Sequence, residues 1–371
     1  MKDKRWLFNG LFMAVVFVIT LIYVFKGEDL GEMMTYIRNA NATYWIPAVI
    51  FVVLYVFCDA ALIYYLTSSL GVKIKATHSV IYAFVGYFFS CITPSASGGQ
   101  PAQAYYMFKD GIPVALSTMV LLIIATEYKL VLVIIALFVM IVRPASIYPL
   151  LLPEIFWCRL GLVLNVALIA FVLMLMFKNS ITKRWVLAVV RFLGRKNIVK
   201  NADFYVAHYS DIMDQYADAA DYFRTHMKVA GIAFIITIVQ RFLLFSVTYL
   251  VYKSLGLSGA SFVRIVTLQA MISAAADMLP LPGGMGISEK LFRSIFTPIF
   301  GKALLPGMVL SRSLSYYTEL LLSAVMTLVA HYAIGRKKNL GDMIRNGEGR
   351  AYRLGKGDIS PSNRPTEGRK E

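Results

Sequence analysis

Two glycine pairs interrupt apolar stretches of this chain at corresponding places in its two halves. The first lies in residues 93–101 (TPSASGGQP) and the second in residues 279–286 (LPLPGGMG). Proline and glycine break helices, and a broken backbone persists inside a bilayer only where protein or a water-filled cavity surrounds it. Paired breaks of this kind are typical of the binding site of an inverted-repeat transporter. The pattern therefore favours a membrane carrier over a simple membrane anchor.

Composition places the chain among polytopic membrane proteins. Of its 371 residues, 58% are hydrophobic, and several apolar runs are long enough to cross a hydrocarbon core of about 30 Å. The run from Leu7 to Phe25 has the length of a span and no clear small-residue cleavage site, so we interpret it as the first span rather than a signal peptide. The odd number and the spacing of Cys58, Cys91 and Cys158 argue against a disulfide framework or a metal site.

The net charge of +16 is concentrated on one predicted side of the membrane. One acid-free stretch holds seven basic residues: Lys178, Lys183, Arg184, Arg191, Arg195, Lys196 and Lys200. Arg336, Lys337 and Lys338 follow the last apolar run. Short loops rich in Lys and Arg stay in the cytoplasm, so we expect both termini there. A nucleic-acid partner is not expected, because the charge flanks membrane spans and no nucleic-acid motif accompanies it.

Charge and hydropathy together predict an all-α fold with an inverted-topology repeat. One re-entrant hairpin includes Val80–Ile92 and returns to the cytoplasmic side near Lys109; the other includes Phe262–Met278 and Ile287–Phe300 and opens to the outside near Gly301. Each half reads span, span, hairpin, span, starting from opposite faces. A fold with eight full spans is the alternative. The six predicted full spans are Leu7–Phe25, Trp45–Thr67, Val114–Val142, Arg159–Phe177, Val229–Val251 and Met308–Ile334.

This topology divides the chain into four parts. Residues 1–177 form the first membrane half, which includes the first span of the second repeat, and residues 229–335 complete the second repeat. Residues 178–228 form a basic cytoplasmic linker that contains an amphipathic helix, Ala202–Arg224, with a solvated acidic face. Residues 336–371 form a basic tail with few apolar residues, which we expect to be disordered.

Ionisable residues inside a bilayer are costly and are functional candidates. Glu127 and Glu319 fall at comparable depths in their spans. Acids and bases at this level predict one cavity that suits a zwitterionic or charged headgroup, since Arg pairs with phosphate oxygens and a carboxylate holds an ammonium group. The predicted substrate-binding residues are Ser97, Gly98, Gly99, Gln100, Gln103, Glu127, Lys129, Arg241, Asp277, Pro282, Gly283, Gly284, Gly286, Glu289, Arg312 and Glu319. We expect no catalytic residue, metal or cofactor.

Three segments of the chain resemble a known family: TPSASGGQP at 93–101, YYMFKDG at 105–111 and LPGGMGISE at 281–289. They are similar to the transmembrane region of lysylphosphatidylglycerol synthases, the flippase portion of the multiple peptide resistance factor and its stand-alone bacterial relatives. The resemblance covers roughly residues 5–335. It implies a bacterial plasma-membrane protein that moves a phospholipid, such as aminoacylated phosphatidylglycerol, between leaflets. It also implies a contribution to resistance against cationic antimicrobial peptides.

The chain departs from this family in two ways that bear on function. Full-length relatives carry a soluble synthase domain after the spans, where this chain has a short basic tail, so we expect a carrier rather than an enzyme. Many relatives have an acid and an arginine where this chain has Gln100 and Gln103, so the headgroup preference is left open. The alternatives are a phosphatidylglycerol lysyltransferase or a partner subunit of one, and a small-solute secondary transporter. Partners would be phospholipid and either a second copy of the chain or a separate synthase.

Overall fold

The described part of the chain is an all-helical, multi-pass membrane protein, as the sequence predicts. The computed structural model describes residues 30–93, 96–195, 202–279, 284 and 286–333. Within these ranges the chain forms helices and no strand. Five segments are apolar and long enough to cross a membrane: Ala42–Ser69, Val114–Val142, Tyr148–Phe177, Met227–Ser254 and Ile287–Ala330. The predicted first span, Leu7–Phe25, and the tail 336–371 lie outside the described residues.

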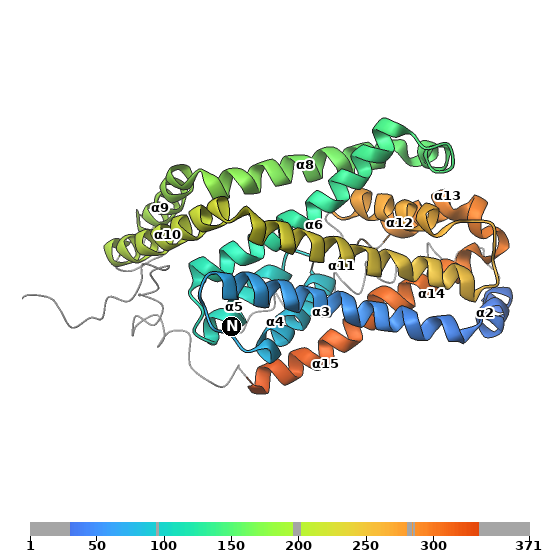
Figure 1. Cartoon of the computed structure of the whole chain (residues 1–371), viewed down its shortest axis with the longest axis horizontal. Helices are drawn as coiled ribbons and strands as arrows, with labels where there is room; N and C mark the ends of the chain where they lie inside the picture. The colour runs from blue at the N-terminus through green and yellow to red at the C-terminus, as the bar shows by residue number, and fades with distance from the viewer. Residues whose placement is uncertain (1–29, 94–95, 196–201, 280–283, 285, 334–371) are drawn as a thin grey trace, which may run out of the picture.

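Two long helices, α3 (Trp45–Ser69) and α11 (Met227–Ser254), cross the whole molecule side by side (Figure 1). They run antiparallel: the Asn41 amide before α3 donates to the Ser254 carbonyl at the end of α11, 2.7 Å away. Near their middles, Gln240 Nε2 donates to the Tyr55 carbonyl at 3.2 Å. One helix comes from each half of the chain, so this contact joins the two halves.

The first glycine pair forms the tip of a helical hairpin. Helix α4 (Ala76–Ile92) ends at an extended Thr93, and α5 (Gly99–Lys109) begins after the break. At the open end, the His78 imidazole contacts the Asp110 carboxylate, and the Tyr82 hydroxyl donates to the same carboxylate at 2.5 Å. The start of α4 and the end of α5 therefore lie together, close to the end of α3.

The second glycine pair separates the helices of a matching hairpin, α12 (Phe262–Ala276) and α13 (Ile287–Phe300). Its open end packs on the last turns of α11 through aromatic rings. Tyr249 meets Phe262 at a ring-centroid distance of 5.2 Å, and Tyr252 meets Phe300 at 5.4 Å. Because α3 and α11 are antiparallel, the two hairpins open at opposite ends of the molecule (Figure 1). This is the inverted arrangement that the sequence predicts.

Helix lengths favour hairpins over eight full spans. Helix α4 has 17 residues, α12 has 15 and α13 has 14. At about 1.5 Å rise per residue, none of them reaches across a hydrocarbon core of about 30 Å. The polar breaks must therefore lie inside the protein, where other segments satisfy their backbone groups.

Each hairpin is followed by a long helix. After the first comes α6 (Val114–Val142); after the second comes a composite helix of α14 (Leu304–Arg312), the π turn η4 (Ser313–Tyr317) and α15 (Thr318–Ala333). The composite helix begins four residues before the predicted Met308, because Pro306 falls in its first turn, where proline is tolerated. The predicted end at residue 334 lies outside the described residues.

The remaining helices lie at the ends and one side of the bundle (Figure 1). Helix α8 carries apolar side chains exposed on the outside of the protein, including Val163 and Phe171, which suits contact with lipid tails. Helices α9 and α10 pack together at the end where the first hairpin opens. Their bounds and those of the other short elements are α2 (Leu30–Asn39), η1 (Ala42–Tyr44), α7 (Tyr148–Leu151), η2 (Leu152–Glu154), α8 (Ile155–Phe177), α9 (Asn179–Arg195), α10 (Ala202–Thr225) and η3 (Gly301–Ala303).

Close packing at the first hairpin predicts a strict need for glycine. A Cβ on Gly99 would lie 2.0 Å from Ser90 Oγ and 2.8 Å from the Gly86 carbonyl oxygen of the facing helix. We expect Gly99→Ala to destabilise the protein by about 1–3 kcal/mol, because α4 and α5 would have to separate. Thermal unfolding in detergent measures the effect. Gly231→Ala is the control, since a Cβ there meets nothing within 4 Å; equal unfolding temperatures for the two variants would contradict the prediction.

The inverted hairpins predict opposite membrane sides for Lys75 and Lys302, which are both exposed. Lys75 precedes α4 at the open end of the first hairpin, and Lys302 follows α13 at the open end of the second. Single cysteines at these positions, in a variant lacking Cys58, Cys91 and Cys158, report their sides by reaction with an impermeant maleimide added to intact cells. We expect Lys302→Cys to react and Lys75→Cys to react only after permeabilisation. Reaction of both in intact cells would contradict this topology.

Candidate functional site

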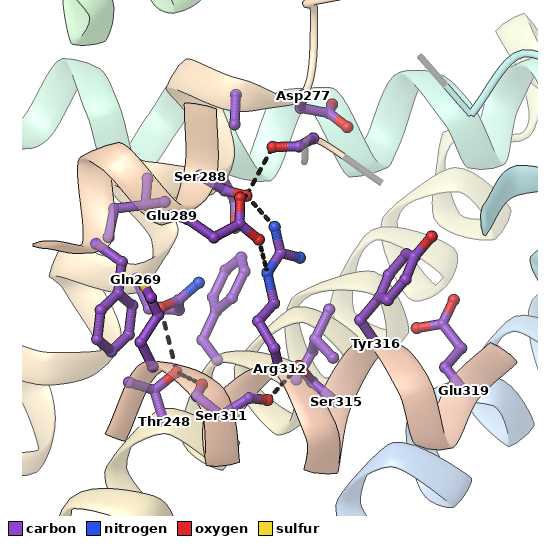
Figure 2. A pocket seen from close by; sticks show the side chains of 18 of the residues that line it. Thr248, Gln269, Asp277, Ser288, Glu289, Ser311, Arg312, Ser315, Tyr316 and Glu319 are labelled. Carbon is purple, nitrogen blue, oxygen red and sulfur yellow. Dashed lines mark hydrogen bonds and ion pairs between the residues drawn. The ribbon is translucent and has the colours of Figure 1, made fainter. Parts of the chain in front are cut away.

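A cavity of about 210 Å³ lies where the tips of the two hairpins approach each other. Ala96 from the first tip and Gly284 from the second both line it. Tyr128, at the middle of α6, forms part of the wall, and the rest comes from α11, α12, α13 and the composite helix α14–α15. The cavity therefore lies part-way along the spans, between segments of both halves. Figure 2 shows its polar side chains.

An ion pair between two helices dominates one side of the cavity. Arg312 Nε donates to Glu289 Oε1 at 2.8 Å, and the same guanidinium contacts the Ser288 hydroxyl (Figure 2). Glu289 is 7% exposed, and its other carboxylate oxygen accepts a hydrogen bond from the Gly286 amide at 2.6 Å. One carboxylate thus closes the broken start of α13 and holds an arginine at the cavity. Gly284 and Gly286 have φ values of +66° and +86°, which a residue with a Cβ rarely adopts.

A second ion pair connects the two halves. The Lys129 ammonium group contacts the Asp277 carboxylate, and Asp277 lines the cavity. Lys129 belongs to α6 and Asp277 follows α12 at the second break. Both side chains are largely buried, with 13% and 19% exposed. A negative group in the cavity would meet the Arg312 guanidinium, and a positive group would meet carboxylates from Glu289 and Asp277. Lys129 does not line the cavity and acts on it through its contact with Asp277.

The opposite wall carries small polar groups in a hydrogen-bonded row. The Thr248 hydroxyl donates to Gln269 Oε1 at 3.1 Å and lies 2.9 Å from the Ser311 hydroxyl (Figure 2). Ser311, Ser315 and Glu319 follow one another at intervals of four residues along the composite helix, so they share one face. The face formed by Ser311, Ser315 and Glu319 spans the π turn Ser313–Tyr317. π turns within helices often mark functional sites.

Arg241 lies behind the cavity wall. It is 7% exposed, and its guanidinium carbon is 3.7 Å from the centre of the Tyr128 ring and 5.1 Å from that of Tyr55. Its Nη1 donates to the Tyr55 hydroxyl at 3.2 Å, whereas its Nε finds no hydrogen-bond partner among the described residues. The two aromatic faces stabilise the charge through cation–π contacts. A buried arginine without a paired carboxylate in the described structure is unusual.

The structure brings some of the predicted site residues together and separates others. Asp277, Gly284, Glu289, Arg312 and Glu319 line the cavity, Lys129 reaches it through Asp277, and Gly286 closes its rim. The remaining residues lie elsewhere: Ser97 and Gln100 are exposed, Gly98 and Gly99 start α5, Gln103 bonds Asp59 and Glu127 bonds Thr237. Pro282 and Gly283 lie outside the described residues.

Helix geometry explains the position of Glu127. Successive residues of an α-helix are about 100° apart, so Glu127 and Lys129 point to nearly opposite sides of α6. Lys129 faces Asp277, and Glu127 faces α11, where it accepts a hydrogen bond from the Thr237 hydroxyl at 3.2 Å. The depth of Glu127 along its span was readable from the sequence, but its direction was not.

Several residues of the site have no signal in the sequence that we recognised. Tyr128, Thr248 and Gln269 are common residue types in helices. Ser288 falls within the LPGGMGISE segment at 281–289, but nothing in that segment indicates its contact with Arg312. The four-residue spacing of Ser311, Ser315 and Glu319 was a usable signal, since it places three polar groups on one face of an apolar span.

Comparison with known protein families gives one match for this chain. Residues 10–323 match the family described as "Lysylphosphatidylglycerol synthase TM region". The chain belongs to this family. The match covers both hairpins, the cavity and the linker helices, so the site described above lies entirely within the family's transmembrane region. A comparison with curated proteins found no match. Membership indicates a role in handling membrane lipid.

The ion pair at the cavity predicts strong coupling between Glu289 and Arg312. We expect the single variants Glu289→Gln and Arg312→Gln each to lower stability, because each leaves an uncompensated charge in a partly buried site. The double variant should lose about 2 kcal/mol less unfolding free energy than the sum of the losses in the two single variants. Thermal unfolding of all four proteins in detergent gives this coupling energy.

The control for this cycle is the pair Lys183–Asp214 on the linker helices, with side chains 33% and 64% exposed. Solvent screening should keep its coupling below about 1 kcal/mol. Strictly additive effects at Glu289 and Arg312 would show that the contact contributes nothing to stability.

Proposed function

We propose that this protein moves a phospholipid between the leaflets of the plasma membrane, with its headgroup in the cavity between the hairpin tips. The observation that carries the proposal is the charged cavity part-way along the spans, lined by the tips of two inverted hairpins. Inverted-repeat transporters hold their substrates near the bilayer midplane at the repeat interface. Membership in a family named for lysylphosphatidylglycerol synthesis supports a lipid as the substrate.

The size and charge of the cavity support a headgroup rather than a whole lipid. Pockets that enclose drug-sized ligands hold about 300–1,000 Å³, and this one holds about 210 Å³. The acyl chains would stay in the bilayer while the headgroup crosses. Arg312 supplies donors for a phosphate, and Glu289 and Asp277 supply acceptors for an ammonium group. Phosphatidylglycerol, with or without an aminoacyl group, meets these requirements.

Movement of the two halves against each other would expose the cavity to each leaflet in turn. In transporters with inverted repeats, access alternates through rocking of one repeat around a fixed site. Here α3 of the first half packs along α11 of the second half, and the two hairpins open at opposite ends of the molecule. We propose that the basic linker lies on the cytoplasmic side and that the protein moves aminoacylated lipid to the outer leaflet. This lipid would lower the negative charge of the cell surface and so weaken the binding of cationic peptides.

Purified protein in liposomes tests this proposal. Fluorescent phosphatidylglycerol that reaches the inner leaflet is protected from dithionite, and a panel of headgroups gives the preference. We expect protein-dependent movement without any aminoacyl-tRNA. Absence of movement for every headgroup, together with aminoacylation of lipid when charged tRNA is added, would favour the lysyltransferase alternative.

Arg312→Gln should slow lipid movement by about 10- to 150-fold. Loss of a hydrogen bond to a charged group costs about 1.5–3 kcal/mol, which corresponds to that range. Lys302→Gln is the matched control, because Lys302 is exposed and does not line the cavity. Equal rates for Arg312→Gln and the parent protein, at equal amounts of folded protein, would show that this cavity does not carry the headgroup.

A further inference from the structure

A second polar cluster lies away from the cavity lining, where the two halves of the chain cross. Asp59 on α3 is 6% exposed, and its carboxylate accepts a hydrogen bond from Gln103 Nε2 of α5 at 3.1 Å. Gln240 of α11 is fully buried and donates both to the Tyr55 carbonyl and to the Tyr87 hydroxyl. Residues from α3, α4 and α5 thus meet residues of α11 within one buried group.

Within the part of the chain that the structure describes, Asp59 has no cationic partner in direct contact. Among the described residues, no Lys or Arg nitrogen forms an ion pair with it, and the side chains that hydrogen-bond to it are the neutral amides of Gln103 and Gln240. Arg241 is near enough to act on it electrostatically without touching it. A buried carboxylate is costly without a paired charge, and neutralisation by a proton removes that cost.

The adjacent residues Gln240 and Arg241 of α11 each carry one buried polar atom that has no hydrogen-bond partner among the described residues. Gln240 Oε1 is buried and accepts no hydrogen bond from any described residue, and Arg241 Nε is buried and donates none. Buried polar groups of this kind are rare in native proteins. A protonated Asp59 would add one hydrogen-bond donor to a cluster in which the Gln240 Oε1 acceptor is unused.

Other titratable groups surround Asp59. Tyr55 and Cys58 lie on its own helix, Tyr87 faces it from α4 and Glu319 from α15; each interacts with it electrostatically. The ring of Tyr128 on α6 packs against the Arg241 guanidinium. Glu319 also lines the headgroup cavity. Charge at Asp59 is thereby within electrostatic reach of a residue that the lipid headgroup would meet.

From this arrangement we propose that Asp59 binds a transported proton at the crossing of the two halves, and so couples lipid movement to the proton gradient. The inference rests on the proposed lipid movement. An ionised Asp59 attracts Arg241 across the boundary between α3 and α11, and protonation removes that attraction. The proton would thus change the balance between arrangements of the two halves. A proton taken up from one side is released to the other as the halves move.

Steady-state lipid asymmetry tests the coupling. Purified protein is reconstituted into vesicles with fluorescent phosphatidylglycerol, a pH difference of one unit is imposed, and the membrane potential is clamped to zero with valinomycin and equal potassium. A one-unit gradient corresponds to about a tenfold shift in equilibrium for each coupled proton. We expect wild-type protein to shift the leaflet ratio toward this tenfold limit, and to leave it near one without a gradient. Protein-free vesicles give the background.

Asp59→Asn should still move lipid but hold the leaflet ratio near one under the gradient. Asp214→Asn, which removes an exposed carboxylate of the linker, is the control and should respond as the wild type does. A wild-type ratio near one at every gradient overturns the proton proposal and leaves lipid movement standing. Full asymmetry in Asp59→Asn overturns the assignment to this residue. Absence of any lipid movement in wild-type protein overturns the proposed function itself.

A second variant keeps the assignment testable where Asp59→Asn does not reconstitute. Asp59→Glu retains a carboxyl group but moves it by one methylene away from Gln103. We expect this variant to keep the gradient response, with a changed pH for its half-maximal value. A response with the same pH dependence as the wild type would show that the proton binds elsewhere.

Discussion

The need to satisfy backbone groups inside the bilayer governs this architecture. Four short helices stop within the protein, and each stop leaves amide or carbonyl groups without helical partners. The chain supplies side chains for this purpose: Thr93 Oγ1 accepts from the Gly98 amide at 2.9 Å, and Glu289 accepts from the Gly286 amide at 2.6 Å. In the second case the capping carboxylate also holds Arg312. The same constraint that permits a broken helix thus places a charged pair at the cavity.

The two ion pairs at the cavity each join residues that are far apart in the sequence. Lys129 and Asp277 are 148 residues apart in sequence, and Arg312 lies 23 residues after Glu289. Each pair is costly to bury and stable only when both members are present. Their shared position at the cavity therefore ties the integrity of the hairpin tips to the electrostatics of the site.

The sequence predicted the framework well because hydropathy and length decide it. Apolar runs, glycine pairs and basic loops indicated the spans, the two hairpins and their inverted order. The described part of the structure contains the hairpins, their inverted order and the predicted spans after the first, Leu7–Phe25, which lies outside it. The direction of a side chain around a helix was harder to predict. Glu127 and Lys129 are two residues apart, yet one bonds Thr237 and the other Asp277. Helix rotation is set by packing against neighbouring helices, which no local pattern records.

The neighbours of Asp59 could not be predicted from the sequence either. It is the single acid in a strongly apolar span, and its neighbours Gln103 and Gln240 lie 44 and 181 residues away along the chain. Only the antiparallel crossing of α3 and α11 brings them together. The headgroup cavity and this cluster are neighbours on α11, because Leu244 and Thr248 line the cavity and Gln240 lies about one turn before Leu244. Glu319 takes part in both, since it lines the cavity and interacts electrostatically with Asp59. A single composite helix with a π turn thus connects the place where a headgroup would bind to the place where the two halves would separate.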